Sequence, residues 1–261
     1  MRVALGQTIG FPGDINANLD LMGRLAAEAA TRGAELLVLP ELFLSGYNIG
    51  DAMADLAQPL PGPASRAAAE IARRNGLAIA YGFPERAAEG LYNTVLLVDR
   101  HGQALASYRK SHLWGEMERA LFLPGGASPV FDFLGLRTAF MICYDLDFPE
   151  IARQLALDGA EAIICLSATT KPYHVVPRML VPARAYENRI FVLFANRAGS
   201  ENGLEYVGES CLAAPDGSVL AKGDAGPELI IGEIAGDRFA AFQRDHAYRA
   251  DRRPELYLSR L

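Results

Sequence analysis

The feature that most constrains the fold of this chain is the way its strand-like segments are connected. Some are separated by helix-like stretches, whereas others are joined by tight turns such as Asp99-Arg-His-Gly102. A barrel of eight strand-helix units requires a helix after every strand, and a plain doubly wound sheet has nearly the same requirement. The mixture therefore favours an α/β chain with two mixed sheets packed face to face and helices outside.

Hydrophobic periodicity and turn residues define the individual segments. The expected helices cover residues 16–30, 64–74, 150–157 and 175–189. The expected strands cover residues 2–8, 35–40, 77–82, 92–99, 103–108, 136–142, 162–166, 190–195, 206–214, 218–221 and 228–234. The stretch 110–126 is polar and aromatic without clear periodicity, which predicts a functional loop. The polar, arginine-rich tail at 237–261 is expected to form a C-terminal arm.

The length and composition indicate one globular domain spanning residues 1–261. Half of the residues are apolar (51%), 21% are charged, and no Ser/Gly-rich linker divides the chain. The formal net charge of -6 argues against a nucleic-acid partner. No segment is long and apolar enough for a membrane span, and the first residues lack the core of a secretory signal. We therefore expect a cytoplasmic protein.

Cys143 stands at a strand-to-helix turn. It follows the apolar run 136–142, and Pro149 is placed to begin a helix with Asp147 as a plausible cap. Such a turn lifts a nucleophile clear of its own backbone. The other two cysteines, Cys165 and Cys211, lie within predicted strands and are interpreted as small buried hydrophobic residues. Three widely spaced cysteines exclude a disulfide framework and make a zinc site improbable.

Two charged residues share the placement of Cys143 directly after a predicted strand. Glu41 follows residues 35–40, and Lys110 follows residues 103–108. If these strands are neighbours, the thiol can attack a carbonyl, the carboxylate can relay its proton and the ammonium can stabilise the oxyanion. A positive charge about 4 Å from the sulfur is worth on the order of 4 kcal/mol, so Lys110 is expected to lower the thiol pKa towards neutrality. Neither a metal nor another cofactor is needed.

With these residues in view, the chain resembles the nitrilase superfamily of carbon-nitrogen hydrolases, whose signature is a Glu-Lys-Cys triad. The resemblance spans nearly the whole chain. It rests on Leu39-Pro-Glu-Leu-Phe-Leu-Ser-Gly-Tyr47, Tyr108-Arg-Lys-Ser-His-Leu113, Cys143-Tyr-Asp-Leu-Asp-Phe-Pro-Glu150, Arg184-Ala-Tyr-Glu-Asn188 and Ala195-Asn-Arg-Ala-Gly199. It implies an αββα sandwich that pairs into a four-layered homodimer or a higher homo-oligomer.

The resemblance also assigns roles to the triad. It makes Glu41 the general base, Lys110 the oxyanion-stabilising cation and Cys143 the nucleophile, with the amide N–H of Tyr144 as a second oxyanion donor. A second glutamate is expected in the loop shortly before Pro124-Gly125. Glu118 fits this place, and Glu116 is a close competitor.

Within the superfamily the chain is similar to amidases of short linear substrates, and Gly46-Tyr-Asn-Ile-Gly50 is similar to bacterial 5-aminopentanamidases. This finer resemblance implies hydrolysis of a small primary amide; N-carbamoyl amides and nitriles are the alternatives. A cationic substrate amine would need an uncompensated carboxylate, for which Asp145, Glu118 and Glu209 are candidates. Other expected substrate contacts, from their places in loops or at strand ends, are Tyr47, Trp114, Thr169 and Thr170.

Two other interpretations were weighed. His112 or His174 could form a papain-like pair with Cys143, but the sequence around this cysteine lacks that family's local signature. A catalytically idle binding subunit is the alternative of another class. The presence of all three reactive groups argues against it.

Overall fold

The computed structural model describes residues 1–235, 240 and 250–256 and contains two six-stranded sheets. The first sheet joins β14 (Glu228–Glu233), β1 (Arg2–Gln7), β2 (Leu36–Val38), β3 (Ala78–Arg86), β4 (Leu91–Val98) and β5 (Ala104–Arg109) in that order. The second sheet joins β13 (Val219–Lys222), β12 (Cys211–Ala213), β9 (Phe191–Asn196), β8 (Ala162–Ser167), β7 (Leu136–Ile142) and β6 (Phe131–Phe133). Strands β10 (Ala198–Glu201) and β11 (Leu204–Val207) form a separate ribbon.

Both sheets are mixed. In the first, β1, β2 and β3 are parallel neighbours while β14, β4 and β5 pair antiparallel. In the second, β7, β8 and β9 are parallel and the outer strands antiparallel. This mixture confirms the arrangement predicted from the two kinds of connection.

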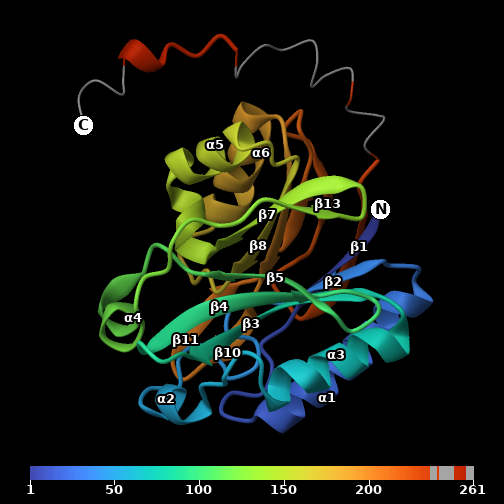
Figure 1. Ribbon diagram of the computed structural model, residues 1–261, viewed down its shortest axis with the longest axis vertical. Helices are drawn as coiled ribbons and strands as arrows, with labels where there is room; N and C mark the ends of the chain where they lie inside the picture. The colour runs from blue at the N-terminus through green and yellow to red at the C-terminus, as the bar shows by residue number, and fades with distance from the viewer. Residues whose placement is uncertain (236–239, 241–249, 257–261) are drawn as a thin grey trace.

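Helices cover the outer faces, so the fold is an αββα sandwich (Figure 1). Helices α1 (Ile15–Thr31) and α3 (Pro63–Asn75) pack on the first sheet, and α5 (Pro149–Leu157) and α6 (Val181–Asn188) pack on the second. Alternation along the strands produces these layers because successive side chains point to opposite faces. Phe140 and Ile142 enter the core between the sheets, whereas Ala139 and Met141 pack against the helices of the second sheet.

Several predicted boundaries were wrong for local reasons. The single helix predicted at 175–189 is a π-helical turn, Val176–Leu180, followed by α6, because prolines at 177 and 182 each remove a backbone donor. The strand predicted at 206–214 is divided into β11 and β12. Gly208 and Glu209 between them both adopt positive φ values, of 64° and 53°, which extended strands do not.

The predicted loop 110–126 contains a short helix, α4 (Gly115–Leu121), and residues 52–56 form another, α2 (Ala52–Leu56). Neither is long enough to show a reliable period. The C-terminal arm expected at 237–261 lies mostly outside the described residues and stays a prediction. Within the described part of the chain, none of the helices combines the length and apolar character that crossing a bilayer requires.

Candidate active site

The carboxylate, the ammonium and the thiol predicted to act together do converge, and they come from different sheets. Glu41 follows β2 and Lys110 follows β5 in the first sheet, whereas Cys143 follows β7 in the second. Lys110 and Glu41 have fully buried side chains, and Cys143 is half-buried. Both charged groups lie close enough to act electrostatically on the thiol. The site is therefore assembled across the boundary between the two sheets.

A close backbone crossing fixes the position of Glu41. A Cβ atom on Gly82 of β3 would lie 2.5 Å from the Leu42 nitrogen and 2.7 Å from the Pro40 oxygen, so only glycine leaves room for this segment. Leu42 adopts a left-handed conformation with φ of 49°. The buried guanidinium of Arg197 holds the strained turn by donating to the carbonyl oxygens of Glu41 (3.1 Å) and Leu42 (2.8 Å).

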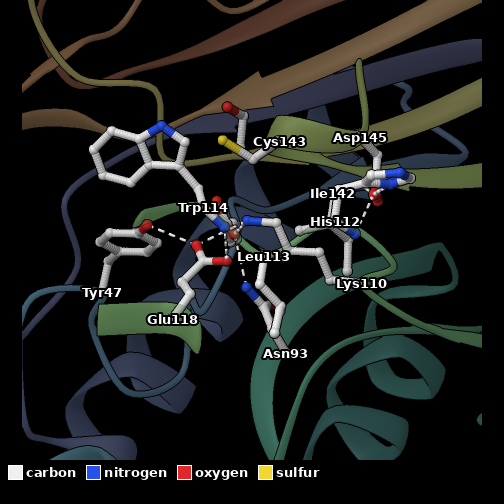
Figure 2. A network of polar contacts seen from close by, with 12 residues as sticks. Tyr47, Asn93, Lys110, His112, Leu113, Trp114, Glu118, Ile142, Cys143 and Asp145 are labelled. Atoms are coloured by element: carbon white, nitrogen blue, oxygen red, sulfur yellow. Dashed lines mark hydrogen bonds and ion pairs between the residues drawn. The ribbon is translucent and has the colours of Figure 1, made fainter. Parts of the chain in front are cut away.

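One buried cation serves two buried carboxylates at the centre of the site. The Nζ atom of Lys110 lies 2.6 Å from Oε1 of Glu41 and 2.8 Å from Oε1 of Glu118. Figure 2 shows Lys110 beside Glu118. Burial lowers the pKa of Lys110, but the charges of Glu41 and Glu118 raise it more, and it stands well above its usual value. Lys110 is therefore a permanent cation.

The two oxygens of Glu41 have different surroundings. Oε1 accepts from Lys110 and, at 2.7 Å, from Nδ2 of Asn93. Oε2 is buried and has no hydrogen-bond partner among the described residues. Burial raises the pKa of Glu41, Lys110 lowers it and Glu118 raises it, with a raised value as the net result. An unpartnered oxygen on a carboxylate of raised pKa suits a proton acceptor.

Glu118 is positioned by the short helix α4. Its Oε1 also accepts from the Tyr47 hydroxyl at 2.6 Å, and its Oε2 accepts from the Trp114 backbone N–H at 2.9 Å. The structure thus brings Glu118 into the cluster, whereas Glu116 on the same helix is exposed. Tyr47, expected as a wall of the pocket, also orients this carboxylate.

Cys143 occupies a strained position at the end of β7. Its φ of 47° lies in the left-handed region, which non-glycine residues seldom adopt, and a short 3-10 helix, Cys143–Asp147 (η1), follows. Its Sγ atom lies 3.9 Å from the Thr169 hydroxyl oxygen. The predicted turn between strand and helix is present, and it places the thiol where the charges of Glu41 and Lys110 act on it.

These surroundings contradict the expectation that the Cys143 thiol is ionised near neutral pH. Burial and the charge of Glu41 raise the pKa of Cys143, Lys110 lowers it, and the result is about 12. The prediction that Lys110 holds the sulfur ionised treated the lysine as an isolated charge. Because two carboxylates already neutralise it, the thiol keeps its proton until a base removes it.

Asp145 does not line the pocket. Its buried carboxylate accepts from the Tyr108 hydroxyl (2.8 Å), the Ile142 N–H (2.9 Å), and both the N–H and Nδ1 of His112 (3.0 Å each). In Figure 2 this group lies apart from Tyr47 and Glu118. The expectation that Asp145 meets a substrate amine is therefore replaced by a role in holding the turn after β7.

The other candidates for a free carboxylate or a catalytic histidine are also engaged elsewhere. Glu209 accepts from Nε of Arg178 (2.7 Å) and Nδ1 of His174 (2.9 Å), which lower its pKa to about 2 against the opposing effect of burial. His112 stacks on Phe148 with ring centroids 4.1 Å apart. Nδ1 of His112 bonds Asp145 and Nδ1 of His174 bonds Glu209, so the papain-like pair with Cys143 finds no support among the described residues.

A small pocket opens beside the sulfur. Its empty space, the open mouth included, is about 460 Å³. Of the expected substrate contacts, Tyr47, Trp114, Thr169 and Thr170 line it together with Cys143, and so does Tyr144, the expected oxyanion donor. The other lining residues are Asp147, Ala168, Tyr173 and Val176.

Three contributing residues were missed from the sequence. Asn93 lies within β4, where asparagine is uncommon, and that composition was an available signal. Arg197 carried a weaker signal as a cation directly after a buried strand. Asp147 was interpreted as a helix cap, but its side chain makes no capping bond and lines the pocket instead.

The fold and the site define a hydrolase of the nitrilase superfamily. The carbon-nitrogen hydrolase family model matches residues 2–244, and the chain belongs to this family of enzymes.

The chain is also similar to individual hydrolases and amidases. It is 45% identical over 98% of its length to a protein named hydrolase in pqqF 5'region, from Pseudomonas protegens, covering 90% of that protein. It is 37% identical over 97% of its length to an (R)-stereoselective amidase from a Pseudomonas species, covering 92% of it. The fold matches the amidase from Nesterenkonia sp. AN1 with a TM-score of 0.90, 35% identity and full coverage of both chains, in a structure showing acrylamide added to the active site cysteine.

Proposed function

We propose that this enzyme hydrolyses a small linear primary amide to a carboxylate and ammonia through a thioester on Cys143. The observation that carries the proposal is the unpartnered Oε2 of Glu41, on a carboxylate whose raised pKa makes it an effective base for a protonated thiol nearby. Two of the relatives described above bear the name amidase, which supports an amide substrate.

In the first half of the reaction, Glu41 takes the proton from Cys143 as the sulfur attacks the amide carbon. The carbonyl π pair moves to oxygen, and the resulting negative charge is stabilised by Lys110 and the backbone N–H of Tyr144. Lys110 has three donors, and two are directed at Glu41 and Glu118, which leaves one for the oxyanion. The C–N bond breaks as Glu41 returns the proton to nitrogen, and ammonia leaves.

In the second half, water replaces ammonia. Glu41 removes a proton from the water while the water oxygen attacks the thioester carbon. The C–S bond then breaks, and the thiolate of Cys143 takes that proton back from Glu41. Glu118 also pairs with Lys110, at 2.8 Å, so the ammonium keeps a carboxylate partner when Glu41 is protonated. The product is the free carboxylic acid, and the enzyme returns to its starting state.

The substrate is proposed to be an ω-amino amide such as 5-aminopentanamide, with N-carbamoyl amides and nitriles as the alternatives that the same triad can process. The wild-type protein should be mixed with 5-aminopentanamide, butyramide, an N-carbamoyl amine and butyronitrile, and quenched in acid within the first turnover. Mass spectrometry should then find an acyl group on Cys143 and none on Cys165. The variant Cys143→Ala should gain no mass.

Ammonia measured in the same mixtures separates the alternatives. Release from the amides supports the proposal. Release from the nitrile alone would overturn the amidase assignment, and complete inertness of Cys143 towards all four compounds would favour a non-catalytic subunit.

A further inference from the structure

Asp147 is the one acidic side chain among the described residues that line the pocket of Cys143. It is exposed, and it makes no ion pair with any described residue. Burial of part of the side chain raises the pKa of Asp147, and the charges of Arg184 and Lys110 lower it by less, so the net shift is upward. A carboxylate that faces a substrate pocket without a cation of its own can accept one from the substrate.

The backbone that carries Asp147 is held firmly. Arg184 donates from Nε to the Leu146 carbonyl at 2.9 Å and from Nη2 to the Asp147 carbonyl at 3.1 Å. Its Nη1 is engaged by Glu187 at 3.0 Å. Arg184 therefore fixes the place of Asp147 while its own charge is directed at another carboxylate. The backbone that carries the binding group is held in position before the substrate arrives.

The remaining walls of the pocket also suit a cation. Trp114 and Tyr173 are 37% and 47% exposed, and their rings meet edge to face with centroids 6.4 Å apart. Tyr144 adds a third aromatic ring. Aromatic faces attract ammonium groups, and no lysine or arginine is found among the described lining residues to repel one.

The geometry points to Asp147 as the residue that determines substrate specificity, by binding an ammonium group at the end of the amide substrate remote from the scissile bond. This inference rests on the proposed function, since it places the amide carbon at Cys143. It predicts that the enzyme prefers a cationic amide to a neutral or an anionic amide of similar length. An anionic substrate would meet Asp147 without a compensating cation.

The test compares kcat/KM for 5-aminopentanamide, pentanamide and glutaric acid monoamide in the wild type and in Asp147→Asn. The variant should lose on the order of tenfold for the cationic amide, mainly through KM, and stay within about twofold for pentanamide. The anionic amide should be hydrolysed faster by the variant. In the wild type, added salt should weaken turnover of the cationic amide alone.

Two further variants control for indirect effects. Asp147→Glu should retain most of the preference, because it keeps the charge. Glu116→Gln removes an exposed negative charge on α4 that does not line the pocket, and it should leave the preference unchanged. An equal loss for all three amides in Asp147→Asn, or a matching effect of Glu116→Gln, would overturn the inference while leaving amide hydrolysis intact. Failure of the wild type to hydrolyse any of the amides would instead remove the proposed function and this inference with it.

Discussion

Replacing Glu41 by glutamine separates the two effects that this carboxylate has on Cys143. The glutamine amide has the same shape, and its oxygen can still accept from Lys110 and Asn93. It cannot accept the thiol proton. Loss of a positioned general base costs about 10²- to 10⁴-fold in rate, or about 3–5 kcal/mol of barrier. We expect kcat for amide hydrolysis to fall by that factor.

The same substitution should make the thiol more acidic. The negative charge of Glu41 is one of the causes that raise the pKa of Cys143 to about 12, and glutamine removes it. The rate at which iodoacetamide labels Cys143, measured from pH 6 to 10.5, should rise without a plateau in the wild type. In Glu41→Gln the whole profile should move to lower pH by about one unit or more, because a pKa change of one unit needs only about 1.4 kcal/mol.

The two assays should therefore diverge, with slower hydrolysis and a more acidic thiol in the same protein. Thermal unfolding serves as the control, and Tm should stay within about 3 °C of the wild type because the substitution leaves Lys110 paired with Glu118. Hydrolysis within tenfold of the wild type would refute the role of Glu41 as base. A wild-type labelling plateau near neutral pH would show that the thiolate is already formed and that the electrostatic reasoning is wrong.

Three other substitutions test the supports of the site. Tyr47→Phe removes the 2.6 Å hydrogen bond to Glu118 and should cost about 1–3 kcal/mol of unfolding free energy, measured in urea, together with a loss of kcat. Arg197→Met leaves two buried carbonyls without their donor and should lower Tm by several degrees and reduce kcat. Glu209→Gln tests pH dependence. Because the pKa of Glu209 is lowered from its ordinary value of 4.5, the ionised carboxylate stabilises the fold above pH 4.5, and this stabilisation is lost as the pH falls towards 2. The free energy of unfolding measured across that window should therefore decline less in the variant.

The sequence was sufficient for the arrangement of the sheets and for bringing Glu41, Lys110 and Cys143 together as candidates. The apolar run before Cys143 and Pro149 after it predicted the strand-to-helix turn, because local sterics and backbone donors decide both. Glu41 and Lys110 were found because they share the same position after a strand. These inferences depend on short stretches of chain, where sequence is most informative.

The electrostatics of the site could not be predicted in the same way. Whether Lys110 activates the thiol depends on which other charges it meets, and Glu118 reaches it from a helix too short to be seen in the pattern. Asp145 and Asp147 are two aspartates only two positions apart in the sequence. The turn between them buries the first among donors and leaves the second facing the pocket, a difference that only the folded backbone determines.

The reacting groups are divided between the two halves of the sandwich, with the base Glu41 and the cation Lys110 on one and the sulfur of Cys143 on the other. The catalytic rate therefore depends on how the two sheets are aligned, since a misplacement of about 1 Å can cost about 10²-fold in rate. Replacing a large side chain of the hydrophobic core between the sheets by a smaller one, as in Phe140→Leu, should allow one sheet to shift relative to the other. Such a molecule would lose its catalytic power well below the temperature at which it melts.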